Sequence, residues 1–196
     1  MTGSTDRALR RAVGLVAGLN LAYFGIEFAA ALRIGSVSLF ADSVDFLEDA
    51  SVNLLILLAL GWSARARARV GMGLAALLLA PGIATLWTAW RKFADPSVPE
   101  PLTLTLVGLG ALAINLTCAF VLARFRGHSG SLTKAAFLSA RNDAFANLGI
   151  IAAGLVTVAI ASPWPDLVVG LAIAALNLDA AREVWEAAHE EHREAA

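Results

Sequence analysis

The sequence predicts an all-α, polytopic membrane protein with six transmembrane helices and both termini in the cytoplasm. Hydrophobic residues fill 58% of its 196 positions, and only 16% are charged, against roughly 25% in ordinary soluble domains. The apolar residues gather into six runs, each close to or above the roughly 20 residues that a helix needs to cross a bilayer. The runs are rich in Ala and Leu and lack strand-like alternation, so we expect helices.

The six predicted spans are residues 12–32, 36–61, 70–90, 102–123, 135–161 and 164–185. We expect one transmembrane domain over residues 1–196, with a cytoplasmic arm at residues 1–11 and a cytoplasmic tail at residues 186–196. The first run is long enough to span and lacks an obvious cleavage site, so we interpret it as a retained anchor. Pro81 interrupts the third run and predicts a kink.

Positive charges set the expected orientation. One set of connections, together with both termini, carries eleven Arg or Lys residues: Arg7, Arg10, Arg11, Arg65, Arg67, Arg69, Arg124, Arg126, Lys134, Arg182 and Arg193. The opposite connections carry three, namely Arg33, Arg91 and Lys92. Because cytoplasmic loops are enriched in Lys and Arg, the eleven mark the cytoplasmic side. The net charge of −1 gives no reason to expect a nucleic-acid partner, so the expected surroundings are the lipid bilayer.

Four acids lie within eight residues of the second span: Asp42, Asp45, Glu48 and Asp49. At about 100° per residue, the three aspartates and Asn53 share one helical stripe, whereas Glu48 points elsewhere. An ionised Asp at the bilayer centre costs about 2.5–3.5 kcal/mol on insertion scales, so three on one face need a partner. A buried core helix with salt-bridged acids is the alternative, but few cations are nearby. The stripe therefore favours an intramembrane cation site.

The fifth span carries a second polar pair at the same spacing. Ser139 and Asp143 are four residues apart and share a face, which Asn147 continues. If the second and fifth spans run antiparallel side by side, Asp45, Asp49, Ser139 and Asp143 can converge. Four oxygen-bearing side chains around one point are suited to a divalent metal ion.

Other polar residues in the spans have simpler interpretations. Asn115 and Thr117 are expected to form interhelical hydrogen bonds rather than to bind a ligand. Cys118 lies in an apolar run and is interpreted as a small buried residue, since a single cysteine cannot form an internal disulfide. His189 and His192 in the tail are interpreted as part of a solvated helix end rather than as a surface metal site.

Glu27, Glu48 and Arg141 are charged residues within the spans, and Arg33 lies at the end of the first span. Glu27 in the first span has two open interpretations: an ion pair with Arg33 near the outer surface, or a part in relaying protons. Glu48 and Arg141 both point off the ligand stripe and would be costly alone in the bilayer, so we expect them to pair. The alternative is that Arg141 extends to the cytoplasmic surface.

Two stretches resemble signatures of the cation diffusion facilitators. GSVSLFADSVDFLED is similar to the second-helix signature of that family, and Asp45 and Asp49 fall on its two ligand positions. AAFLSARNDAFANLG is similar to the fifth-helix signature, in which Asp143 matches the second ligand and Ser139 stands where His or Asp is usual. The resemblance covers almost the whole chain, and we expect a short form that lacks the cytoplasmic metal-binding domain typical of many members.

The resemblance implies proton-coupled export of a divalent metal, often zinc, by a homodimer in the plasma membrane, which in bacteria is the inner membrane. It implies Asp45, Asp49 and Asp143 as ligands, with Ser139 as a weak fourth ligand or as the holder of a ligating water. Zinc is the first expectation, followed by Mn, Fe, Co and Cd, and no permanently bound cofactor is expected. Because carboxylate ligands must be deprotonated to bind metal, metal and protons compete for the site.

Two other classes of function stay open from the sequence. The chain can be a non-transporting structural or regulatory membrane subunit, with its metal site degraded by Ser139. Paired aspartates can also perform acid–base chemistry in an intramembrane aspartyl protease, but the sequence lacks the GxGD motif. A transporter, and not an enzyme, is therefore expected.

Overall fold

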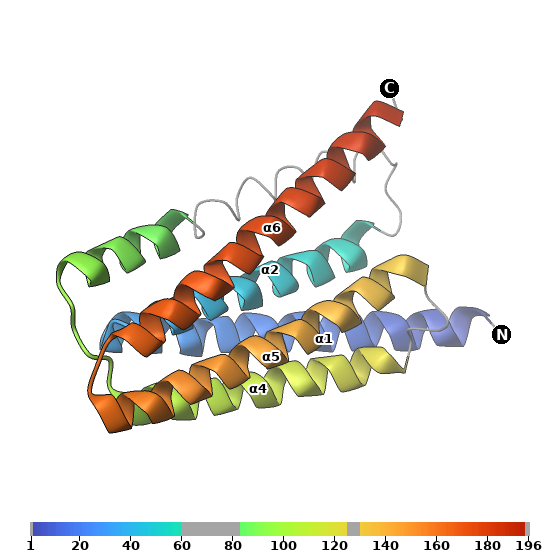
Figure 1. The fold of residues 1–196 in the computed structure, drawn as a ribbon. Coiled ribbons are helices and arrows are strands. Elements are labelled where there is room, and N and C mark those ends of the chain that lie inside the picture. The colour runs from blue at the N-terminus through green and yellow to red at the C-terminus, as the bar shows by residue number, and fades with distance from the viewer. Residues whose placement is uncertain (1, 60–82, 125–129, 195–196) are drawn as a thin grey trace.

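The computed structural model describes residues 2–59, 83–124 and 130–194, and the regular structure within these ranges is entirely helical (Figure 1). The labelled helices are α1 (Thr2–Ile34), α2 (Val37–Ala59), α4 (Pro101–Ala123), α5 (Gly130–Ile160) and α6 (Trp164–Glu194). Residues 83–94 form a further helical stretch between α2 and α4. This confirms the predicted all-α class.

Several helices are longer than the apolar runs that predicted them. The first begins at Thr2 rather than at residue 12, the fifth at Gly130 rather than at 135, and the sixth continues to Glu194. Polar residues such as Glu, Arg and Lys are good helix formers, so hydrophobicity marks the part of a helix that crosses the membrane, not the helix ends. The third helix continues to residue 94, past the predicted 90. The kink predicted at Pro81 lies outside the described residues.

Length and composition identify three membrane-crossing helices within the described part of the chain. These are Arg7–Ile34, Pro101–Ala123 and Asn142–Ile160, and the apolar stretch Trp164–Leu178 is shorter. Helix α2 has the same length as α4, 23 residues, but its four acids lower its hydropathy. Large side chains such as Leu106, Leu155 and Val158 remain exposed on the bundle surface, as expected for contact with lipid.

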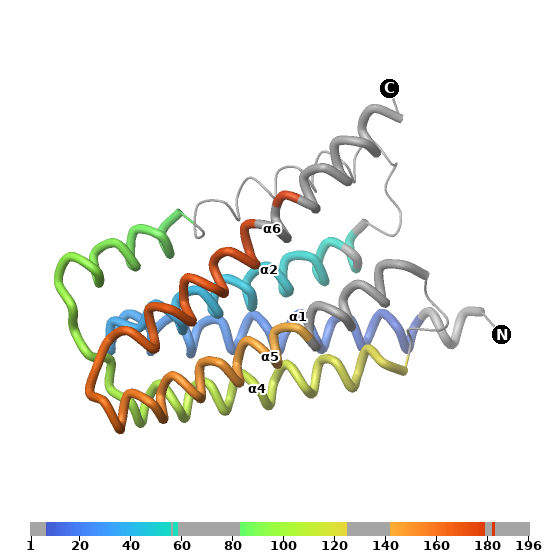
Figure 2. Tube along the Cα trace, viewed as in Figure 1, coloured from blue at the N-terminus to red at the C-terminus, as the bar shows by residue number. Residues whose placement is uncertain are grey.

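Helix α2 lies at the centre of the arrangement, because it contacts each of the other four labelled helices. Helices α1 and α2 form one closely packed pair, and α4 and α5 form another. Figures 1 and 2 show these helices running lengthwise through the bundle, with α6 crossing obliquely over α2. Both termini lie at the same end of the bundle (Figure 1), the end with the predicted excess of Arg and Lys. By the positive-inside rule, we expect this end to be cytoplasmic and the opposite end to be extracytoplasmic.

The opposite, extracytoplasmic end is held by the buried carboxylate of Asp166, in the first turn of α6. Its two oxygens accept hydrogen bonds from Ser36 Oγ (2.6 Å), Val37 N (2.9 Å), Ser38 N (3.2 Å) and Ser38 Oγ (2.7 Å), and Lys92 Nζ lies 3.4 Å away. The side chain therefore satisfies the free amides at the start of α2. Asp166 fixes where α2 begins, and so fixes the depth of its acids in the bundle.

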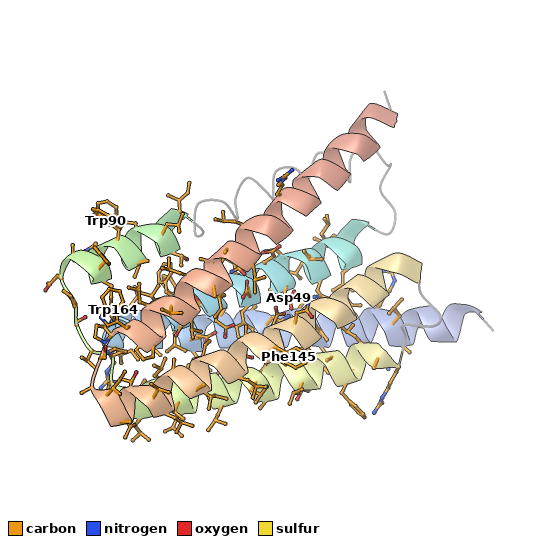
Figure 3. All side chains as sticks on the ribbon, in the orientation of Figure 1. Asp49, Trp90, Phe145 and Trp164 are labelled. Atoms are coloured by element: carbon orange, nitrogen blue, oxygen red, sulfur yellow. The ribbon has the colours of Figure 1, made fainter. Side chains whose placement is uncertain are left out.

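Close backbone contact supports the same junction. A Cβ atom at Gly170 of α6 would lie 2.7 Å from both Ser38 N and Val37 C, so only glycine allows this approach. Aromatic rings gather nearby: Phe93 packs edge-on against Trp164, with ring centroids 5.9 Å apart, and Trp90 stacks on Phe93 (Figure 3). Such rings are enriched at membrane–water interfaces, which agrees with an interface at this end.

Candidate metal centre

The acidic stripe of α2 points into the bundle. Asp42 is fully buried, whereas Asp45, Glu48 and Asp49 are half-buried. Figure 3 shows Asp49 about midway along the bundle, close to α5 in this view. Among charged neighbours, Asp143 of α5 acts most strongly on Asp45, ahead of the other acids of α2. Helices α2 and α5 therefore bring two of the predicted ligands within electrostatic reach of each other.

The rest of the predicted ligand set stays a prediction. Asp49 and Asp143 each have an interaction partner, and the side chain of Ser139 lies outside the described residues. Within the described ranges, no group of three or more His, Cys, Asp or Glu side chains is close enough to hold a metal ion. The four-ligand set is therefore still a prediction. The structure describes the contact between α2 and α5 on which this prediction depends.

Two asparagines join the stripe to the neighbouring helices. Asn147 of α5 donates from Nδ2 to Asp42 Oδ2 at 2.6 Å, and its Oδ1 accepts from Asn115 Nδ2 of α4 at 3.0 Å. The prediction that Asn115 forms an interhelical hydrogen bond is confirmed. For Thr117 it is wrong, because this exposed residue donates to Ala113 O one turn earlier in its own helix. The amide chain fixes α2, α4 and α5 next to the acids.

Glu27 of α1 belongs to the same buried region. Its side chain is 0% exposed, and the charges of Asp42 and Asp45 both act on it. Arg33 is exposed and its charge acts on Glu100, outside the spans. The ion pair between Glu27 and Arg33 is therefore wrong: the two positions are six residues apart, which separates them by about 120° around α1.

Cys118 fulfils its predicted role as a small buried residue. It is a free, buried cysteine on α4, and its Sγ donates to Asn20 Oδ1 of α1 at 3.7 Å. Asn20 and Glu27 lie seven residues apart, two turns along one face of α1. The sequence shows this α1 stripe as isolated polar residues in an apolar run, but it does not show which helix the stripe faces.

The acids, amides and hydroxyls of this region offer oxygen ligands of the kind that bind hard and borderline divalent cations. A search of curated proteins found no significant match. A family model described as the cation efflux transmembrane domain matches residues 13–189, which is most of the chain and includes both predicted signatures. Members of this family are polytopic membrane proteins that transport metal cations. The chain therefore belongs to the cation efflux family of transmembrane proteins.

Proposed function

We propose that this protein exports a divalent metal cation from the cytoplasm in exchange for protons across the plasma membrane, the inner membrane of a bacterium. The observation that carries this proposal is the packing of α5 against the acidic stripe of α2, where Asn147, one turn from Asp143, donates to Asp42 at 2.6 Å. Ionisable residues inside a membrane bundle are costly and mark ion pathways. The family resemblance further supports a homodimer as the active form.

In this proposal, Asp45, Asp49 and Asp143 are both metal ligands and proton acceptors. Like charges so close together in an apolar bundle repel one another, and either a divalent cation or protons relieve that repulsion. Because the carboxylates bind metal only when deprotonated, arrival of the metal releases protons. Alternate opening of one such site to the two sides of the membrane exchanges metal for protons. The membrane potential contributes about 2.3 kcal/mol per charge per 100 mV.

Zinc is the first proposed substrate, followed by Mn, Fe, Co and Cd. Three carboxylates and the Ser139 hydroxyl offer only oxygen, which suits harder ions such as Mn. Zinc also accepts Asp oxygens, and most nitrogen or oxygen sites hold it more tightly than Mn. The ligand set thus favours broad selectivity, whereas the family resemblance favours zinc.

Reconstitution into liposomes tests the proposal. We expect the purified wild-type protein to move Zn²⁺ into the vesicles, and an opposing proton gradient to accelerate this uptake. Asp45→Asn should abolish uptake, whereas Glu100→Gln should not, because Glu100 is an exposed residue before α4 and outside the spans. Wild-type protein that neither binds nor moves any of the five metals would favour the alternative, a non-transporting membrane subunit.

A further inference from the structure

Among the residues that the structure describes, none donates a hydrogen bond to either carboxylate oxygen of Glu27. Both Glu27 oxygens and Asp42 Oδ1 are buried without a described hydrogen-bond partner. Nevertheless, the two carboxyl groups lie within hydrogen-bonding reach of each other. When both are ionised, both are acceptors, so neither can satisfy the other. The contact is completed only when one of the two groups carries a proton and donates it.

No described cation compensates this pair. Lys92 is engaged by Asp166 and Gly35 at the extracytoplasmic end, and Arg33 is exposed. Two facing carboxylates in a low-dielectric interior repel strongly, and an unpartnered buried oxygen adds a desolvation cost. One shared proton removes the repulsion and supplies the missing donor.

The described groups around the pair come from several helices. Helix α6 contributes Asn177, which donates from Nδ2 to Ala41 O, next to Asp42, at 3.2 Å. Helix α1 contributes Tyr23, whose Oη donates to Val107 O of α4 at 2.6 Å. Helix α2 contributes Asp45, which acts on Glu27 after Asp42. Helix α5 contributes Asn147, which donates to Asp42 Oδ2 and leaves Oδ1 free to meet Glu27. These charged and titratable neighbours are acidic or neutral, so a proton is the charge that the pair needs.

We propose that Glu27 and Asp42 hold one proton between their facing oxygens and serve as a proton-exchanging station separate from the metal ligands. This inference rests on the proposed function. Because α2 begins at the extracytoplasmic end, Asp42 lies nearly one turn closer to that side than Asp45. Release of the shared proton leaves the pair with one more negative charge beside Asp45, which favours a cation there. Return of a proton has the opposite effect.

Infrared difference spectroscopy of the reconstituted protein tests the shared proton without any metal. The carbonyl stretch of a protonated carboxyl is separate from that of a carboxylate, so wild type minus Glu27→Gln should show the loss of one protonated-carboxyl band. Asp42→Asn should lose the same band and serves as the second variant if Glu27→Gln does not fold. The matched control is Glu100→Gln, because hydrogen bonds from the side chain and backbone of Thr103 lower the pKa of Glu100 and keep it ionised. A protonated-carboxyl region that is unchanged in both pair variants would overturn the proposal.

Transport measurements test the exchange role. In Glu27→Gln liposomes, the acceleration of Zn²⁺ uptake by a proton gradient should fall to the level without a gradient, while uptake driven by the metal gradient alone continues. Glu27→Asp keeps a carboxyl group and should restore part of the acceleration, which a merely structural role would not predict. If a proton gradient accelerates Zn²⁺ uptake by Glu27→Gln as much as by the wild type, the proposed proton exchange at Glu27 and Asp42 is refuted. Wild-type protein that moves no metal would refute the proposed function instead, and the infrared result would still decide whether the proton is shared.

Discussion

Two buried acidic sites in this bundle have opposite surroundings. At the extracytoplasmic end, Asp166 is 0% exposed, accepts from four donors and faces Lys92 at 3.4 Å. In the middle of the bundle, Glu27 is equally buried, but none of the described side chains or amides donates to it, and Asn147 is the single described donor to Asp42. The first carboxylate is fully satisfied within the protein and joins helices. The carboxyl groups of Glu27 and Asp42 need a proton or a cation that the described side chains do not supply, and a transport site has the same requirement.

The largest effect is expected from Asp49→Ala, which removes a proposed metal ligand from the middle of the bundle. We expect transport to be abolished while the protein still inserts into the membrane, because loss of an intramembrane acid eases insertion. Zn²⁺ uptake by liposomes and the amount of inserted protein are measured together, with Glu100→Gln as the control. Wild-type uptake rates from normally inserted Asp49→Ala protein would show that Asp49 is not a ligand.

The same substitution at the two sites should have unequal effects on stability. Asp166→Asn leaves Lys92 without its partner charge and turns an amide nitrogen towards backbone donors, so we expect a loss of about 3–5 kcal/mol, typical of a broken buried pair. Asp42→Asn should cost much less, because the amide oxygen still accepts from Asn147 and the amide nitrogen can donate to Glu27.

Thermal unfolding of the two variants in the same detergent measures this contrast. Asp95→Ala is the control for the end of the bundle, since Asp95 is exposed there. An Asp42→Asn midpoint as low as that of Asp166→Asn would show that the central acid, too, serves mainly to hold helices together.

A smaller effect is expected from Ser139→His, which changes selectivity. Position 139 is one turn from Asp143 on the same face of α5, so an imidazole there can add a nitrogen ligand. Imidazole suits zinc better than Mn, and we expect the ratio of Zn to Mn affinities to rise about tenfold, or about 1.4 kcal/mol. Titration of both metals at fixed pH measures the ratio. An unchanged ratio would show that Ser139 does not face the metal.

The sequence predicted the acid stripe because a helix has a fixed period. Asp42, Asp45 and Asp49 share a face whatever surrounds α2, and the same rule placed Asp143 and Asn147 together on α5. That α2 and α5 lie side by side was a condition of the predicted site and not a result of the pattern, since periodicity within one helix says nothing about its neighbours. The class of fold was equally accessible, because apolar runs of spanning length leave few alternatives.

What the sequence could not reveal depends on contacts between distant positions. Asp166 shows only as an acid in a first helical turn, yet its partners Ser36 and Ser38 lie about 130 positions earlier in the chain. For Glu27, local spacing left Arg33 and a proton role equally open, and only the packing of α1 against α2 excluded Arg33. Polar satisfaction in a bundle is a tertiary property, so a sequence shows that a buried acid needs a partner without showing which one.

The smallest effect is expected from the pair Glu48–Arg141. Glu48 is half-buried on α2, off the stripe and next to Asp49 in sequence, whereas the side chain of Arg141 lies outside the described residues. If the two side chains pair, Arg141 offsets a charge that would otherwise add to the repulsion among the aspartates, which keeps those free for the metal. A double-mutant cycle with Glu48→Gln and Arg141→Gln should then give a coupling of about 1 kcal/mol in unfolding free energy. Additive effects would mean that Arg141 extends to the cytoplasmic surface instead. Glu48 would then resemble Glu27, which lacks a described hydrogen-bond partner, more than Asp166, which is hydrogen-bonded and faces a lysine.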